Sequence, residues 1–139
     1  MKFQLYLQKV KACKQAQTWA AGRTFEEIYN TCHRGDWLCW LFAYTNPDDL
    51  QLLTLVKGLQ VNEIRHLLTD SRSIAAVDAA IAFGRGAIGI KQLKDAASYA
   101  DAAADDVYAA ARNKSFARSA DIFRKNISID KINRVWETI

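Results

Sequence analysis

The chain has 139 residues, of which half are apolar, only one is proline and six are glycine. This composition fits one globular domain over 1–139 and excludes a disordered chain. The net charge of +4 comes in blocks of alternating sign: +5 over 1–23, −4 over 24–70, +3 over 71–94, −4 over 95–111 and +4 over 112–139. A general nucleic-acid binder is not expected, because such a protein gathers its basic residues on one face.

Alanine is abundant and β-branched residues are sparse, which predicts an all-α fold of six to seven helices. The odd number of cysteines, too few for a disulfide-rich secreted domain, favours a reducing compartment. The N-terminal "MKFQLYLQKVKACK" has polar residues throughout and therefore lacks a signal-peptide core. No apolar run approaches the ~18 residues of a membrane span. We expect a cytoplasmic protein.

The first helix is predicted over 4–21, where apolar residues recur every three to four positions. Gly22 is expected to end it. Thr24 and Glu27 then form a capping box, in which each side chain satisfies a backbone N–H of the first turn. This pair predicts the start of a second helix.

Asp36 stands where an N-cap is expected, and a third helix follows over 37–44. That segment is apolar on all sides, so it is predicted to be buried at the centre. Asn46 as N-cap and Pro47 at the first helical position predict a fourth helix, which runs to about Leu68 and is weakened or kinked at Gly58.

A fifth helix is predicted over 73–83, followed by a glycine-rich turn over 84–89. From 90 to 126 the pattern is helical and alanine-rich without a breaker, which predicts one long helix near the C-terminus. Its acidic residues precede its basic ones, the order that the helix dipole favours. Ser128 is expected to cap a short last helix over 129–137.

Two short motifs match functional signatures only by their letters. Arg34-Gly35-Asp36 spells an adhesion tripeptide, but a glycine turn followed by a helix cap explains the same residues. "GRGAIG" over 84–89 spells a dinucleotide fingerprint, which needs a strand before it and an acidic residue about 20 positions later. A helix precedes it here, so an interhelical turn is expected, with a weak anion site at Arg85 as the alternative.

No metal, cofactor or catalytic centre is predicted. The metal-ligand candidates lack the spacing of a structural zinc site: Cys13, Cys32, His33 and Cys39. Asp101 and Asp105 lie one helical turn apart, but such a pair is usually a solvated face. No nucleophile or carboxylate falls in a recognisable frame with His33 or His66. The sequence therefore predicts a protein that is not an enzyme.

Trp37, Trp40 and Tyr44 lie at i, i+3 and i+7 and form one aromatic stripe on the predicted third helix. Aromatic residues at this spacing are usually core, because each ring buries a large apolar area. The alternative is that Trp37, close to Arg34, lines a groove that receives a partner.

Several stretches resemble the helical immunity-protein family associated with polymorphic toxin systems and also found in phages and mobile genetic elements. They are "ACKQAQTWA", "CHRGDWLCWLF", "FGRG…LKDAASYADAAADDVYAAAR" and "ARSADIFRKNI", which together extend from about Ala12 to Ile127. The most distinctive element is Gly-Asp-Trp-Leu-x-Trp-Leu. The resemblance implies an all-helical domain without known catalysis that binds and neutralises a toxin or effector protein.

Three functions remain open at this point. A toxin binder should expose a contact patch without a deep pocket; because this chain is basic, a basic nuclease toxin is a poor match. The second function is a phage or mobile-element sponge that sequesters an anionic nucleotide in a basic, aromatic-lined pocket, alone or in a homo-oligomer. The third is a helical scaffold for host proteins. The candidate binding residues are Arg34, Trp37, Tyr99, Arg112, Arg118, Asp121 and Arg124.

Overall fold

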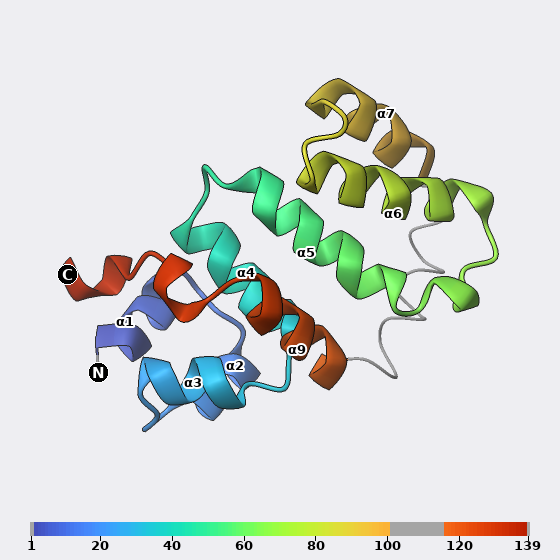
Figure 1. Ribbon diagram of the computed structural model, residues 1–139. Coiled ribbons are helices and arrows are strands. Elements are labelled where there is room, and N and C mark those ends of the chain that lie inside the picture. The colour runs from blue at the N-terminus through green and yellow to red at the C-terminus, as the bar shows by residue number, and fades with distance from the viewer. Residues whose placement is uncertain (1, 101–115, 139) are drawn as a thin grey trace.

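The computed structural model describes residues 2–100 and 116–138, and within these ranges every regular element is a helix (Figure 1). The α-helices are α1 (Lys2–Lys9), α2 (Lys14–Ala20), α3 (Phe25–Thr31), α4 (Gly35–Thr45), α5 (Leu50–Asn62), α6 (Ser71–Gly84), α7 (Ile90–Ala100) and α9 (Phe116–Asn126). Short 3-10 helices are η1 (Arg65–Leu67), η3 (Ile129–Lys131) and η4 (Val135–Thr138). The predicted all-α class is confirmed.

The helices form two neighbouring groups that share α9. One group contains α1 to α4 together with the C-terminal η3 and η4, and the other contains α5, α6 and α7 (Figure 1). Helix α9 packs against both α4 and α5, and α6 lies between α5 and α7. The main core is in the first group, where Phe42, Phe123 and Ile127 are fully buried. This core supports the pocket described below.

The predicted first helix over 4–21 is wrong, because the chain forms two helices there. Lys11 has a φ of 57°, in the left-handed region that ends helices. The N–H of Ala12 donates to the carbonyl of Leu7 at 2.9 Å, which closes the end of α1. The chain then turns, and α2 starts at Lys14 in a new direction. Sequence periodicity continued across this break because α1 and α2 both face the same core.

The Thr24 half of the capping box predicted for α3 is confirmed, whereas the cap predicted for α4 is wrong. Thr24 Oγ1 accepts from the N–H of Glu27 at 3.1 Å. Helix α4 begins one residue before Asp36, and Arg34 occupies its N-cap position without a side-chain cap bond. Asp36 lies in the first turn, where its charge still favours the helix dipole, and its carboxylate binds Arg34.

Asn46 follows the end of α4 and is not the N-cap predicted for the next helix. Its amide donates to the carbonyl of Lys131 at 2.9 Å and accepts from the N–H of Asn133 at 3.0 Å, so it holds the C-terminal segment. Asp49 caps α5 instead, by accepting from the N–H of Leu52 at 3.2 Å. A local sequence pattern could not distinguish these two cap candidates.

The long helix predicted over 90–126 is not seen. Helix α7 ends at Ala100 and packs on α6, whereas α9 starts at Phe116 and packs on α4 and α5 (Figure 1). The two helices lie in different layers and are not parts of one straight rod; residues 101–115 between them lie outside the described residues. The described α-helices number eight, against six to seven predicted. The last α-helix predicted over 129–137 is replaced by η3 and η4.

Candidate functional site

A cavity of about 330 Å³ opens among α1, α2, α3 and α4. Its walls are mainly apolar side chains, including Leu7 of α1, Ile28 of α3 and Leu38 of α4. Three of the four tryptophans of the chain, Trp19, Trp37 and Trp40, also line it. This volume falls within the range of small-ligand sites, roughly 300–1,000 Å³. We call this cavity the tryptophan pocket.

Small residues on α2 leave the space that forms the pocket. Ala16 and Ala20 lie four residues apart in α2 and therefore share one side of the helix, whereas Ala12 belongs to the turn before α2; all three line the cavity. Trp19 from the same helix closes one wall, with its ring centroid 6.2 Å from that of Trp37 on α4. The α2 segment therefore supplies small side chains and one tryptophan to the lining, and α4 supplies the other two tryptophans.

An ion pair stands at the edge of the pocket. Arg34 donates from Nε and Nη2 to the two carboxylate oxygens of Asp36, at 2.8 and 2.7 Å. The same guanidinium lies 4.6 Å from the ring centroid of Trp37, a cation–π distance. The hydrogen bonds to Asp36 raise the pKa of Arg34 further, so its charge is permanent. The lining thus contains one cation and one anion, and they compensate each other.

The thiols near the pocket are poor nucleophiles. Cys32 lines the pocket and is buried, and burial raises its pKa. Cys39 lies deeper in α4, where burial raises its pKa to about 11. A thiol is reactive as its thiolate, so raised pKa values oppose nucleophilic chemistry at both positions. Cys13 lines the rim and is exposed. In the described part of the chain, no group of three or more histidine, cysteine or carboxylate side chains could hold a metal ion.

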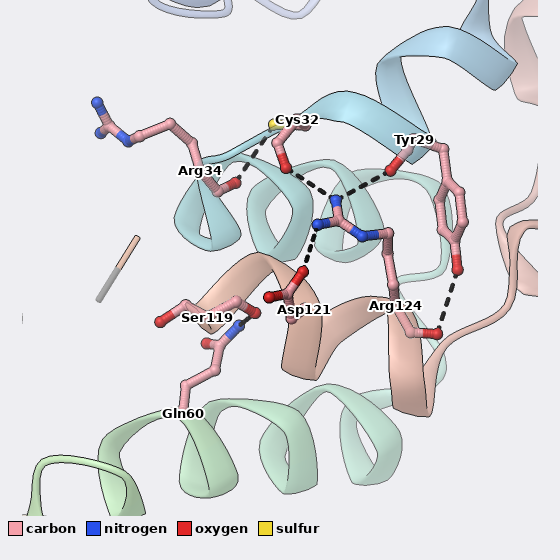
Figure 2. A network of polar contacts seen from close by, with 7 residues as sticks. All are labelled: Tyr29, Cys32, Arg34, Gln60, Ser119, Asp121 and Arg124. Carbon is pink, nitrogen blue, oxygen red and sulfur yellow. Dashed lines mark hydrogen bonds and ion pairs between the residues drawn. The ribbon is translucent and has the colours of Figure 1, made fainter. Parts of the chain in front are cut away.

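The arginines predicted on α9 make structural contacts. Arg124 Nη1 donates to the carbonyls of Tyr29 and Cys32 at 3.1 and 2.8 Å, and Nη2 binds Asp121 at 2.8 Å (Figure 2). These carbonyls belong to the last turn of α3 and to its C-cap, where carbonyls lack helical partners. Arg124 therefore joins α9 to the end of α3, and an anion would have to compete with these contacts.

Arg118 is placed differently from its two neighbours in the predicted row. It reaches across to Glu63 at the end of α5, at 3.2 Å, and both side chains are exposed. Asp121 and Arg124 form a pair, as their spacing predicted. Although Arg118, Asp121 and Arg124 all lie on α9, Arg118 contacts the end of α5, whereas Arg124 contacts Asp121 and the end of α3.

The structure brings together only part of the predicted site. Arg34 and Trp37 meet at the edge of the tryptophan pocket. Figure 2 shows the side chain of Arg34 pointing away from Asp121 and Arg124, which lie on the other side of the segment that joins α3 to α4. Tyr99 lies in α7, but its side chain is outside the described residues, as is all of Arg112.

The aromatic stripe on α4 was only partly interpreted correctly. Trp37 and Trp40 are half-buried and Tyr44 is 50% exposed, so the stripe runs from the pocket to the surface and does not form the centre of the core. The buried face of α4 contains Leu38, Leu41 and Phe42 instead. Trp37 lines a cavity, as the alternative required, and its reception of a partner stays a prediction.

Trp19 was missed as a site residue. The helix predicted over 4–21 contains Trp19 together with Ala12 and Ala16, which precede it by seven and three positions. On one helix these positions lie on the same side, so small residues there could have indicated a space beside the Trp19 ring. The sequence could not show that α2 lies beside α4, which brings Trp19 close to Trp37. Arg23 does not line the pocket, but its guanidinium lies 4.6 Å from the ring centroid of Trp19, and its Nε donates to the carbonyl of Trp19 at 2.8 Å.

The other sequence motifs have structural explanations. Residues 85–89 form the turn between α6 and α7, where Gly86 has a φ of 76° and the N–H of Ala87 donates to the carbonyl of Ala82 at 2.8 Å. The predicted interhelical turn is confirmed. Asp101 and Asp105 lie outside the described residues. No helix within the described ranges is long and apolar enough to cross a membrane.

Comparison of the chain with protein-family models, with curated proteins and with solved structures finds no match.

Proposed function

We propose that this chain is a non-enzymatic binding protein of the immunity type, which neutralises a toxin or effector protein by taking one of its side chains into the tryptophan pocket. The observation that carries the proposal is where the resembling stretches lie. "ACKQAQTWA" and "CHRGDWLCWLF" supply every lining residue of the pocket except Phe3, Leu7 and Ile28. The two segments that resemble immunity proteins thus converge on one cavity, although they are on different helices.

The chemistry of the pocket supports binding without catalysis. Its lining is apolar with one compensated ion pair, and its buried thiol has a raised pKa. Aromatic residues and arginine dominate the energetics of protein interfaces, and both are gathered here. The pocket is deeper than the flat contact patch expected of a toxin binder. In this proposal it receives an anchor side chain, and the surrounding surface excludes water. The free cysteines suit a cytoplasmic site of action.

The test is co-expression with a toxin domain encoded beside the gene in its genome. The wild-type chain should restore growth and co-purify with the toxin. Trp37→Ala should lose both, because the anchor would lose one wall of its pocket. Tyr44→Ala is the matched control: it removes a more exposed aromatic from the same helix, at a position that does not line the pocket. Full protection by Trp37→Ala, with a normal circular dichroism spectrum, would contradict the proposal.

A nucleotide sponge is the second candidate, and the three tryptophans around a ligand-sized cavity favour it. The compensated charge at Arg34 does not favour it, because a phosphate would compete with Asp36 for the guanidinium. Protein purified from phage-infected cells, denatured and examined by mass spectrometry, would release a stoichiometric nucleotide if the sponge is correct. Under the immunity proposal no nucleotide is released.

A further inference from the structure

The size of the tryptophan pocket indicates the size of what it binds. An engineered apolar cavity of about 150 Å³ in another protein holds one benzene ring. The tryptophan pocket, at about 330 Å³, is roughly twice as large. An apolar cavity of this size fits two fused rings better than one ring or a short aliphatic chain.

The charges at the pocket indicate that the bound group is neutral. Arg34 and Asp36, which lie at its edge, are bound to each other through two hydrogen bonds. A charged group in an apolar cavity requires a partner of opposite charge, or it loses its hydration without compensation. Binding an ion here would therefore require that this ion pair be broken.

The walls indicate that the bound group is aromatic. Trp19 and Trp37 are inclined by 52° to one another at 6.2 Å, an arrangement that offers ring edges as well as faces. Aromatic rings pack on such surfaces in offset or edge-to-face geometry and gain more than their buried area provides. Ala16 and Ala20 line the same cavity, and their small side chains leave space beside these tryptophans for a flat ring system.

We propose that the tryptophan pocket binds an uncharged, two-ring aromatic group of the size of indole. The group is either a free molecule or a tryptophan side chain of a protein partner. The inference rests on the proposed function in using the same pocket, but it is tested without any toxin. Loss of indole binding and loss of toxin neutralisation are thus separate results.

The experiment titrates ¹⁵N-labelled protein with indole and follows the indole N–H signals of its four tryptophans. The signals of Trp19, Trp37 and Trp40 should shift together, with a dissociation constant below about 1 mM. Trp136 is an internal control: it does not line the pocket and contacts it only through Phe3, so its signal should shift least. Absence of saturable shifts, or shifts that are largest at Trp136, would overturn the proposal.

A pair of variants locates the binding. Ala16→Leu adds three carbons inside the pocket and should weaken indole binding about tenfold or more. Ala75→Leu makes the same change at an exposed position on α6 and should bind as the wild type does. Equal binding by both variants would place indole elsewhere and refute the assignment. If Ala16→Leu does not fold, the chemical-shift changes of the wild-type tryptophans on titration with indole still show whether indole binds in the pocket.

A second titration, with N-acetyltryptophanamide, separates the two sources of the ring system. This probe contains indole attached to a peptide-like backbone. Binding of both probes at the same three tryptophans supports a side chain of a protein partner as the natural occupant. Binding of indole alone supports a free molecule, because the rim then does not accommodate a backbone.

Discussion

Gly35 shows how the absence of one side chain determines where two helices meet. A Cβ atom at Gly35 would lie 2.7 Å from the backbone nitrogen of Ala120 on α9 and would also overlap Ser119. Helices α4 and α9 approach this closely only because the first residue of α4 is glycine. The glycine of the apparent adhesion tripeptide is thus explained by helix packing.

We expect Gly35→Ala to lower the free energy of unfolding by about 1–3 kcal/mol, the usual cost of overpacking. Urea unfolding followed by circular dichroism measures it. Gly89→Ala is the matched control, because the nearest atom to a Cβ there, Gln92 Oε1, is 4.0 Å away. Similar unfolding midpoints for the two variants would show that α9 can move away from α4 at little cost.

Arg124, which the sequence proposed as an anion-binding residue, joins α9 to the end of α3 in the structure. Lysine in its place keeps the charge but cannot reach both carbonyls of α3 and Asp121 at once. We expect Arg124→Lys to cost about 1–3 kcal/mol of stability, as for hydrogen bonds to a charged group. Arg118→Lys, in an exposed pair with Glu63, should cost less than about 1 kcal/mol.

Thermal melts of the two lysine variants test this difference. An unchanged melting temperature for Arg124→Lys would mean that water satisfies the end of α3 equally well. The contacts of Arg124 would then leave it available for an anion, as the sequence suggested.

At the scale of single elements, the start of α6 depends on a charged cap. Asp70 accepts from the backbone N–H of Arg72 at 2.9 Å and pairs with its guanidinium at 2.7 Å. These contacts lower the pKa of Asp70 to about 2. The folded pKa is below the unfolded value of about 3.9, so the stabilisation is present above that value and is lost as the pH falls towards 2.

We therefore expect the melting temperature of the wild type to fall between about pH 4 and pH 2. Asp70→Asn retains the cap but not the charge, so its melting temperature should fall less over the same interval. Asp48→Asn, an exposed position in the turn before α5, should follow the wild type. Parallel curves for all three proteins would show that Asp70 does not contribute to the acid response.

The sequence predicted helix ends well where the signal was local. Thr24 caps α3, the glycine-rich turn follows α6, and α9 ends at Asn126 as expected. Prediction failed where tertiary contacts decided the end of a helix. Lys11 takes a left-handed conformation that lysine has no intrinsic preference for, and Asn46 binds residues more than 80 positions away.

At the scale of the whole molecule, the tryptophan pocket could be predicted only in part. Arg34 and Trp37 were identified because they are close in sequence. Trp19 was missed because its approach to Trp37 depends on how α2 packs against α4. Spacing on one helix likewise placed Arg124 beside Asp121 but could not reveal the carbonyls of α3 that Arg124 binds. Contacts within an element are encoded locally, whereas contacts between elements are not.

The two ends of the described chain share one aromatic cluster, which is also a property of the whole molecule. The ring centroid of Trp136 in η4 lies 4.8 Å from those of both Phe3 in α1 and Phe25 in α3, and Trp136 is buried. We expect Trp136→Ala to cost about 3–5 kcal/mol, a large part of the stability of such a domain. Trp136→Phe should cost less in urea unfolding, and the exposed Tyr44→Ala least. Equal costs for Trp136→Ala and Tyr44→Ala would show that η4 is dispensable.

This cluster affects how the protein folds during synthesis. Lys2 and Glu137, which are also in contact, are 135 positions apart in sequence. At about 5–20 residues per second, Lys2 is synthesised roughly 7–27 s before Glu137. During that interval Phe3 and Phe25 lack the ring that covers them. The nascent chain thus exposes an aromatic surface until Trp136 has been added, and it is before this step that a chaperone would protect the surface from aggregation.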